Sequence, residues 1–250
     1  MLGKDDGNAI KSSGTASIDG TSPEEFITDN ADILAGFSSR GPAPFTYLIK
    51  PDVTAPGVNV LSSVFDQEFA FFQGTSMATP HLAGSAALLL DLNPDWSPAD
   101  VKSALVNTAA RVVTDSNTGT VDPGVLARGG GRVDLTAAPD IPVTIDPASA
   151  SFGLWKGNKP VSASLDLTVR NVSTSDQTCS VTVQDDPDAP GIVSASGSIE
   201  ALAAGETTTF TLHLDAGRSS DTPSGDYDAD VLLDCDGTEL LVPWWVRINR

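Results

Sequence analysis

The chain has 250 residues, a length that accommodates one or two domains. Its 33 acidic and 14 basic residues give a formal net charge of −19, so binding to nucleic-acid phosphates or to an anionic membrane surface is not expected. Hydrophobic residues make up 40% of the chain, which is enough for a packed core and excludes disorder throughout. We attribute the acidity to solubility in an extracellular or saline setting rather than to an acidic binding patch.

No stretch of the sequence is apolar enough to span a membrane. The longest apolar run, Ala86–Leu90, is far shorter than the roughly 20 residues required. The residues after Met1 also lack the apolar core of a signal peptide. The protein is then either cytosolic or this chain begins inside a longer protein, and the motifs described below favour the second alternative.

Two patterns divide the chain. Residues 36–138 mix strand-like runs with helical periodicity, and residues 143–250 alternate in the manner of β-strands. The stiff segment Pro139–Pro142 predicts a linker between them. Before residue 36 the pattern is weak, with a short helix expected over 5–12 and a short strand over 14–18.

A first helix is predicted over residues 76–92. Apolar side chains surround it on nearly all faces, which is typical of a helix buried at the centre of a domain. Pro80 falls in its first turn, where the missing N–H costs little.

A second helix is predicted over residues 98–110. Ser97 is a suitable N-cap, Pro98 takes the first helical position, and Asp100 stands where a capping-box acid would. The apolar stripe that faces inward consists of Val101, Ala104, Leu105 and Thr108.

About seven short strands are predicted after residue 143, separated by polar turns. This pattern favours a two-sheet β-sandwich of the immunoglobulin or fibronectin type III kind. The expected strands are Val143–Ile145, Ser164–Asn171, Thr178–Gln184, Ile192–Ser196, Thr207–Leu214, Ala229–Cys235 and Glu239–Arg247.

The segment Gly74–His81 (GTSMATPH) contains the candidate catalytic residue. Ser76 opens a helix whose first backbone N–H groups and positive dipole end are available to an oxyanion. Gly74 would let a substrate approach the backbone closely. Taken alone, a serine at a helix start is more often a simple N-cap, so the neighbouring motifs decide between the two interpretations.

These motifs together resemble the subtilisin-like serine proteases, the subtilase family. GTSMATPH is similar to the segment around the family's nucleophile. Four further segments occur in the family's order: Phe37–Pro42 (FSSRGP), Lys50–Val58 (KPDVTAPGV), Leu92–Pro98 (LNPDWSP) and Gly129–Asp134 (GGGRVD). The resemblance implies an α/β fold: residues 1–139 form the C-terminal portion of a parallel-sheet catalytic domain, and residues 143–250 form a fibronectin type III-like β-sandwich. Residues 1–35 resemble the return from an inserted domain.

The resemblance implies a serine endopeptidase that cleaves proteins or peptides through an acyl-enzyme on Ser76. The backbone N–H of Ser76 would donate to the oxyanion, with Gly74 and Thr75 on the same substrate side. A triad also needs a base and an acid that orients it. The family supplies both upstream of the serine, but no histidine precedes Ser76 in this sequence.

The remaining candidates do not replace these groups. His81 follows Ser76 by five residues on the same helix and is expected to point away from it, and His213 is expected on the solvent side of a strand. Asp52 is interpreted as a turn residue rather than the triad acid. Asn8 is a weak candidate for the family's oxyanion-hole asparagine, because acidic residues precede it.

We therefore expect this chain to be inactive alone and to need the missing N-terminal part of the catalytic domain as its partner. A secreted, extracellular protein is expected, with its signal peptide in that missing part. Two alternatives stay open: a non-catalytic binding or adhesion module that keeps a subtilase shell, and an assembly part that complements a separate N-terminal piece.

Cys179 and Cys235 are the only cysteines. Their positions on neighbouring strands of a sandwich make a disulfide plausible, and two buried free thiols are the alternative. No metal cluster has recognisable spacing and no cofactor is expected. Calcium bound at Asp185–Asp188 is an alternative to a solvated turn. Trp155, Trp244 and Trp245 form either an exposed binding patch or a packed interface.

Overall fold

A computed structural model describes residues 31–65, 68–218 and 220–250. The chain divides into two compact units, residues 1–31 and residues 32–250, and every helix and strand described below belongs to the second. The helix expected over residues 5–12 and the strand expected over 14–18 lie outside the described residues. None of the described helices is long and apolar enough to cross a membrane.

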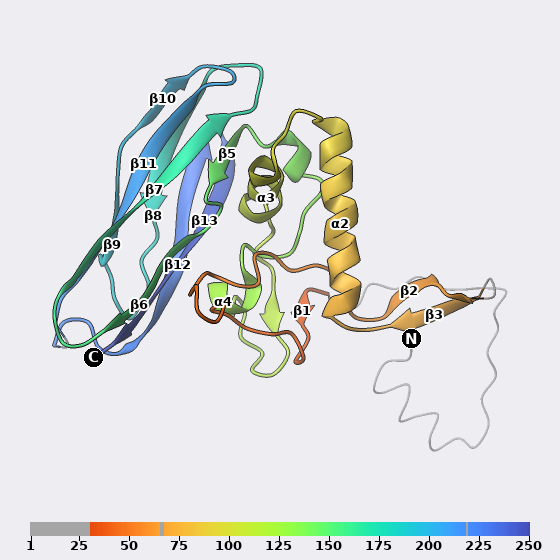
Figure 1. Ribbon diagram of the computed structural model, residues 1–250, viewed down its shortest axis with the longest axis horizontal. Coiled ribbons are helices and arrows are strands. Elements are labelled where there is room, and N and C mark those ends of the chain that lie inside the picture. The colour runs from red at the N-terminus through yellow and green to blue at the C-terminus, as the bar shows by residue number, and fades with distance from the viewer. Residues whose placement is uncertain (1–30, 66–67, 219) are drawn as a thin grey trace. The chain divides into compact units, whose positions relative to one another are not determined.

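Residues 143–250, called here the β-rich region, form two antiparallel-dominated sheets (Figure 1). One has the order β10-β8-β12-β13-β6 and the other the order β5-β7-β11-β9. The strands are β5 (Val143–Asp146), β6 (Ala150–Lys156), β7 (Val161–Asn171), β8 (Gln177–Val183), β9 (Val193–Ser196), β10 (Ile199–Leu202), β11 (Thr207–Ala216), β12 (Gly225–Cys235) and β13 (Thr238–Asn249).

Alternation of apolar and polar side chains explains the two layers. Along β11, Phe210, Leu212 and Leu214 are buried while the intervening residues are not, as expected for a strand with one face on a core. All seven expected strands are present within a few residues of their predicted bounds. The strands β6 and β10 were not predicted, because one carries a glycine and the other has only four residues with a shift of register.

The rest of the unit contains helices and two small sheets. The helices are α2 (Thr75–Leu92), α3 (Pro98–Asn107), α4 (Val125–Arg128) and the 3-10 helix η2 (Ala138–Asp140). The strands β1 (Ile33–Leu34) and β4 (Thr114–Asp115) pair in parallel, and β2 (Val60–Ser63) and β3 (Phe69–Phe72) form an antiparallel hairpin. The described residues thus mix α and β structure, as expected for an α/β fold, although outside the β-rich region β1 and β4 are the only described strands that pair in parallel.

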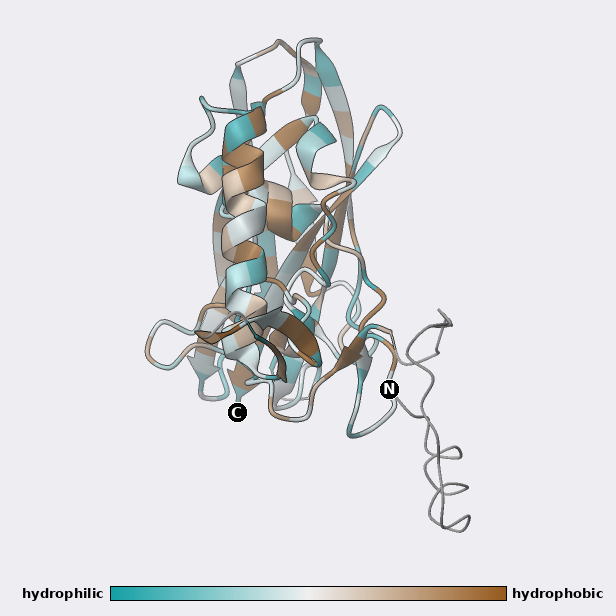
Figure 2. Ribbon diagram, turned by 90° about the vertical axis from the view of Figure 1, so that its right-hand side faces the viewer, coloured by the Kyte–Doolittle hydropathy of each residue, from teal (hydrophilic) through white to brown (hydrophobic). Residues whose placement is uncertain are grey.

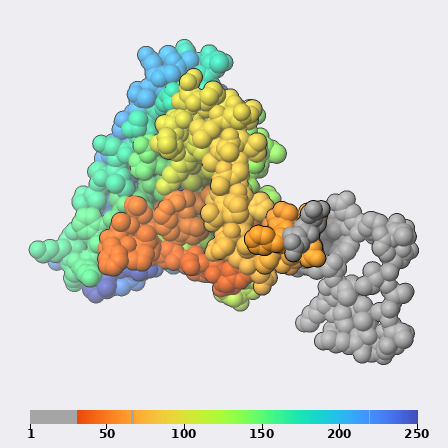
Figure 3. Space-filling model, turned by 45° about the vertical axis from the view of Figure 1, so that its right-hand side comes forward, coloured from red at the N-terminus to blue at the C-terminus, as the bar shows by residue number. Residues whose placement is uncertain are grey.

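The helix α2 has the predicted bounds but not the predicted burial. Among its residues only Ser85 and Leu89 are buried, and Leu88 is 57% exposed. Figure 2 shows hydrophobic residues along the helix, and Figure 3 shows the helix lying on the surface of the face in view. The expectation of a buried central helix is therefore wrong for the described residues, because α3, η2 and the segment that contains Val53 and Gly57 contact the helix and leave its other sides uncovered.

The helix α3 begins as predicted. The hydroxyl of Ser97 accepts a hydrogen bond from the Asp100 N–H at 3.2 Å, and the Asp100 carboxylate accepts one from the Ser97 N–H at 2.9 Å, which completes a capping box. The helix ends at Asn107 rather than at residue 110, because Ala110 leaves it to exchange backbone hydrogen bonds with Arg132.

The main core crosses the expected linker. Leu89 of α2 and Val101, Ala104 and Leu105 of α3 belong to the same buried cluster as the inward side chains of the β-rich region. Polar contacts reinforce this packing, since the Asn107 amide donates to the carbonyls of Ala148 and Leu241 at 2.8 and 2.9 Å. The division of the chain near residues 139–143 stays a prediction.

Candidate functional site

The candidate site is the turn at Gly74–Ser76, called here the Ser76 turn, where the hairpin β2–β3 leads into α2. Gly74 has a φ of 152° and a ψ of 160°, a conformation that side chains disfavour and glycine permits. Ser76 is the second residue of α2 and its side chain is exposed. The sequence interpretation of Ser76 at the opening of a helix is therefore correct.

A backbone hydrogen bond to Gly57 holds the Ser76 turn in place. The Gly74 N–H donates to the Gly57 carbonyl at 2.8 Å. A Cβ on Gly57 would lie 2.9 Å from the Gly74 carbonyl oxygen and 3.3 Å from the Ala78 Cβ. A side chain at residue 57 would push the turn away, so the glycine in the segment Lys50–Val58 is needed for this close approach. Its role was not predicted, although it lies inside a motif that the sequence analysis singled out.

The start of α2 leaves amide groups available. The Gly74 carbonyl accepts from Met77 N–H at 3.0 Å, and within the described residues no hydrogen bond engages the N–H groups of Thr75 and Ser76. The first N–H groups of a helix have no acceptor in the preceding turn, and the helix dipole adds a partial positive charge there. An anionic oxygen that forms beside Ser76 would therefore meet hydrogen-bond donors and a favourable potential.

Neither histidine serves Ser76 in the structure. The Nδ1 atom of His81 bonds to the Met77 carbonyl at 2.8 Å, and its side chain is exposed. The ring of His213 on β11 lies between the hydroxyls of Ser164 and Ser196, at 2.9 and 2.6 Å. In the part of the chain that the structure describes, no side chain hydrogen-bonds to the Ser76 hydroxyl. Asn8 lies outside the described residues.

Asp52 has structural contacts rather than a place beside Ser76. Its carboxylate pairs with Lys50 and, at 2.7 Å, with Lys102. Burial raises the pKa of Asp52, but hydrogen bonds and charge from Lys102 and Lys50 outweigh it and hold the pKa below its usual value. Asp52 is thus ionised and its carboxylate is paired with two lysines, which agrees with its interpretation as a turn residue.

Comparisons with known proteins show which family the segment that contains the Ser76 turn resembles. Residues 8–130 match the model of the subtilase family of peptidases. The chain is 32% identical over 207 residues to the minor extracellular protease Vpr of Bacillus subtilis (strain 168), and 40% identical over 142 residues to the subtilisin-like protease SBT1.5 of Arabidopsis thaliana. It is 51% identical over 85 residues to the Arabidopsis subtilisin-like protease SBT3.7. Residues 8–130, just under half of the chain, are thus similar to the subtilase family.

The matches cover unequal shares of the two sequences. The match to Vpr includes 80% of this chain but 25% of Vpr, and the match to SBT1.5 includes 49% of this chain but 18% of that protease. The match to SBT3.7 takes in 31% of this chain and 11% of the relative. The chain thus spans about a quarter, or less, of the length of these relatives.

The other candidate residues of the sequence lie in the β-rich region. A disulfide joins Cys179 and Cys235, which face each other across β8 and β12. Trp244 and Trp245 are fully buried, so the exposed-patch hypothesis is wrong for them; their indole N–H groups donate to the Gln184 carbonyl at 3.2 Å and to Asp226 at 3.1 Å. Trp155 is partly buried.

The acidic run Asp185–Asp188 forms a turn held by its own carboxylates. Asp186 accepts hydrogen bonds from the N–H groups of Asp188 and Asp228, both at 2.8 Å, and Asp185 accepts one from Gly191 at 2.8 Å. Among the described residues, no three His, Cys, Asp or Glu side chains gather as metal ligands would. Calcium binding stays an untested prediction.

Proposed function

We propose that this chain is the nucleophile-bearing part of a secreted serine endopeptidase. The observation that carries the proposal is Ser76 itself, exposed at the first turn of α2 beside unengaged amide groups, in a segment that matches the subtilase family. Its substrates are peptide bonds of proteins or peptides. The names of the relatives, among them an extracellular protease, support both the activity and a location outside the cell.

The proposed chemistry assigns one step to this chain. The Ser76 Oγ attacks the scissile carbonyl carbon while an imidazole base takes the hydroxyl proton, and the N–H of Ser76 stabilises the oxyanion. The C–N bond then breaks as the imidazolium protonates the leaving amine, and water later hydrolyses the acyl ester. Since no histidine precedes Ser76, the base and the acid that orients it belong to polypeptide outside this sequence.

The chain alone is therefore expected to be inactive. Removing the base of a serine triad lowers kcat by about 10⁴–10⁶, and the partner that restores it is the N-terminal part of the catalytic domain. The test is to measure peptide turnover by this chain, by the chain joined to its upstream coding sequence, and by the joined protein with Ser76→Ala. Turnover by the joined protein that survives Ser76→Ala would contradict the proposal.

One observation favours a binding role as a second candidate. An apolar groove of about 600 Å³ lies between α2 and α3, and its lining includes Leu82, Leu90 and Trp96. A non-catalytic binding or adhesion module would use such surface for a partner other than upstream protease sequence. If the coding sequence upstream of Met1 held no triad Asp and His, this second candidate or a complementing subunit would replace the first.

The β-rich region is proposed to be a fibronectin type III-like β-sandwich. Its two sheets, the shared core between them and the antiparallel pairing of β7 with β11 and of β12 with β13 support this assignment. No cofactor is proposed, and calcium bound at Asp185–Asp188 would be detected by titration calorimetry on the whole chain.

A further inference from the structure

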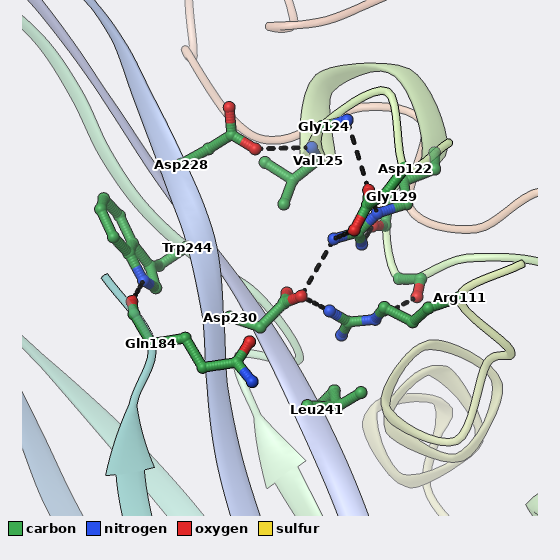
Figure 4. A network of polar contacts seen from close by, with 12 residues as sticks. Arg111, Asp122, Gly124, Val125, Gly129, Gln184, Asp228, Asp230, Leu241 and Trp244 are labelled. Atoms are coloured by element: carbon green, nitrogen blue, oxygen red, sulfur yellow. Dashed lines mark hydrogen bonds and ion pairs between the residues drawn. The ribbon is translucent and has the colours of Figure 1, made fainter. Parts of the chain in front are cut away.

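An acidic face of strand β12 contacts the segment 111–128, and its burial increases from the exposed Asp226 to the buried Asp230. Asp226, Asp228 and Asp230 alternate along β12, a spacing that places their side chains on one face of the strand. Figure 4 shows Asp228 directed toward Val125 and Asp230 directed toward Arg111. Asp230 is only 4% exposed. A buried carboxylate needs charged or hydrogen-bonding partners, and this one has two arginines.

Arg111 and Arg128 converge on one oxygen of Asp230. The Nη1 atom of Arg111 pairs with Oδ2 of Asp230, and the Nη2 atom of Arg128 lies 2.9 Å from the same oxygen. Burial and then the positive charge of Arg128 lower the pKa of Arg111 to about 9, so Arg111 remains cationic at neutral pH. Arg128, which is 2% exposed, also pairs with Asp122 through Nε and Nη2, whereas Asp230 is the only carboxylate among the described residues that pairs with Arg111.

The same two arginines hold the turn Gly129–Gly131, called here the glycine turn. Arg111 Nε donates to the Gly130 carbonyl at 3.1 Å, and Arg128 Nη1 donates to the Gly129 carbonyl at 2.7 Å. Asp230 therefore orients Arg111 and, together with Asp122, Arg128, and these two side chains hold the glycine turn. Because these donors are planar guanidinium groups, their direction is set once the carboxylate has bound them.

The glycine turn is hydrogen-bonded to the segment 52–54, which leads along the chain to Gly57 and the Ser76 turn. The Gly130 N–H donates to the Asp52 carbonyl at 2.9 Å, and the Gly131 carbonyl accepts from the Thr54 N–H at 2.7 Å. The approach is close, because a Cβ on Gly129 would lie 2.3 Å from the Asp52 carbonyl oxygen. A displacement of the glycine turn is thus passed directly to Asp52 and Thr54.

Gly57 follows Thr54 by three residues, and its carbonyl accepts the Gly74 N–H at 2.8 Å. We propose that Asp230, in the β-rich region, is a positioning residue for Ser76, acting through the arginine pair, the glycine turn and the Gly57–Gly74 hydrogen bond. The β-rich region is then a support of the site rather than an appendage. The inference extends the proposed function, and its test needs no peptidase activity.

The test is native-state hydrogen exchange of single backbone amides in the whole chain. Asp230→Asn keeps the shape of the side chain and removes its charge. We expect the N–H groups of Gly130, Thr54 and Gly74 to exchange at least about tenfold faster, which corresponds to about 1.4 kcal/mol of local opening. The Gly74 amide is the decisive probe, because it reports on the turn that carries Ser76.

Two controls separate positioning from general destabilisation. Asp234→Asn makes the same change on the same face of β12, at an exposed position, and should alter the three rates by no more than about twofold. Leu212→Ala lowers the stability from the opposite sheet and should leave Gly74 unaffected under conditions in which global unfolding does not contribute. If Gly74 exchange stays unchanged in Asp230→Asn while the Tm falls, Asp230 is only structural and the inference is overturned.

A second variant serves if Asp230→Asn does not fold. Arg111→Lys keeps a cation for Asp230 but lacks the Nε donor to Gly130. Faster exchange at Gly74 in the folded Arg111→Lys protein supports the inference, and an unchanged rate contradicts it. A failure of the proposed function would appear differently, as a joined protein without Ser76-dependent turnover whose exchange pattern is still coupled to Asp230.

Discussion

The β-rich region and the segment that contains α2 and the β2–β3 hairpin differ in how far their apolar side chains are buried. In the β-rich region Leu167, Leu212 and Leu233 are completely buried. In the other segment Leu88 and Leu92 of α2 and Phe71 of the hairpin are exposed by 57%, 62% and 67%. The two segments have similar side chains, so the difference lies in what covers them.

The difference shows that burial of an apolar face depends on which elements pack against it. A strand whose apolar face meets a second sheet of the same chain buries that face within the region, as β11 and β12 do. A helix that is apolar on all sides needs neighbours on all sides, and within the described residues α2 contacts α3, η2 and the segment that contains Val53 and Gly57. Exposed apolar surface of this extent is typical of a surface that binds another polypeptide, in agreement with the proposed need for an N-terminal part.

Removing the disulfide is the largest expected perturbation of the β-rich region. Cys179 and Cys235 have a sequence separation of 56, for which chain-entropy arguments assign about 4 kcal/mol of stabilisation. We expect the double variant Cys179→Ala, Cys235→Ala to lose about that free energy of unfolding in urea titrations. An equal loss in the wild type under reducing conditions would confirm the cause, and a loss confined to one of the two conditions would contradict it.

A matched pair of leucine substitutions tests the comparison directly. Leu212→Ala in β11 removes a fully buried side chain and should cost about 3 kcal/mol, within the usual range for a core leucine. Leu88→Ala in α2 should cost less than about 0.5 kcal/mol, because that side chain is mostly exposed. Similar losses of unfolding free energy at the two sites would contradict the conclusion that Leu212 is covered and Leu88 is not. In the joined protein, the cost of Leu88→Ala should rise.

Asp100 joins α3 to the β-rich region, and its ionisation should appear in the stability profile. Its carboxylate accepts from the Thr144 hydroxyl at 2.6 Å and pairs with Arg170 at 2.8 Å. Burial raises the pKa, but hydrogen bonds from Thr144 and Ser97 and the charge of Arg170 bring it below the usual value. Asp100→Asn should cost about 1–2 kcal/mol at pH 7.

The sign of the pH effect follows from the lowered pKa of Asp100. Its contribution is complete above the unfolded-state pKa and is lost as the pH falls through the lower folded-state pKa. Urea titrations of wild type and Asp100→Asn should therefore converge in acid. A constant difference between the two proteins down to pH 2 would contradict this account.

Asp228 should show the opposite and smallest effect. Burial, with the nearby negative charge of Asp186, raises the pKa of Asp228 although the Val125 N–H donates to it at 2.8 Å. Stability is then lost as the pH rises from the unfolded-state pKa through the folded-state pKa. Asp228→Asn should raise the Tm at pH 7, and the free energy of unfolding should increase by less than about 1 kcal/mol. Asp228→Ala should lower the Tm, because alanine cannot accept a hydrogen bond from the Val125 N–H. A lower Tm in both variants would show that the charge is needed.

Much of the local structure followed from the sequence because its determinants are local. Ser97, Pro98 and Asp100 are enough to place the start of α3, and alternation along Phe210, Leu212 and Leu214 is enough to place β11. Ser76 was located by its motif and by its place at the start of a helix. The strand β10 escaped prediction because four residues carry too little periodicity.

The burial of Asp230 could not be predicted from the local sequence pattern. Alternating aspartates on β12 indicate a face in water, since isolated carboxylates avoid the interior. Arg111 and Arg128 lie more than 100 residues away along the chain, and nothing in the local pattern connects them with Asp230. The residue was therefore absent from the predicted site.

The sequence by itself indicated the resemblance to subtilases, Ser76 as the candidate nucleophile and most helices and strands, because motifs, caps and periodicity act over a few neighbouring residues. The tertiary structure alone decided which apolar and charged faces are buried: α2 is exposed and Asp230 is enclosed. Burial depends on the groups that meet across the fold, and a side chain's own type sets only the free energy of burying it. The same leucine or aspartate is thus inside or outside according to its partner.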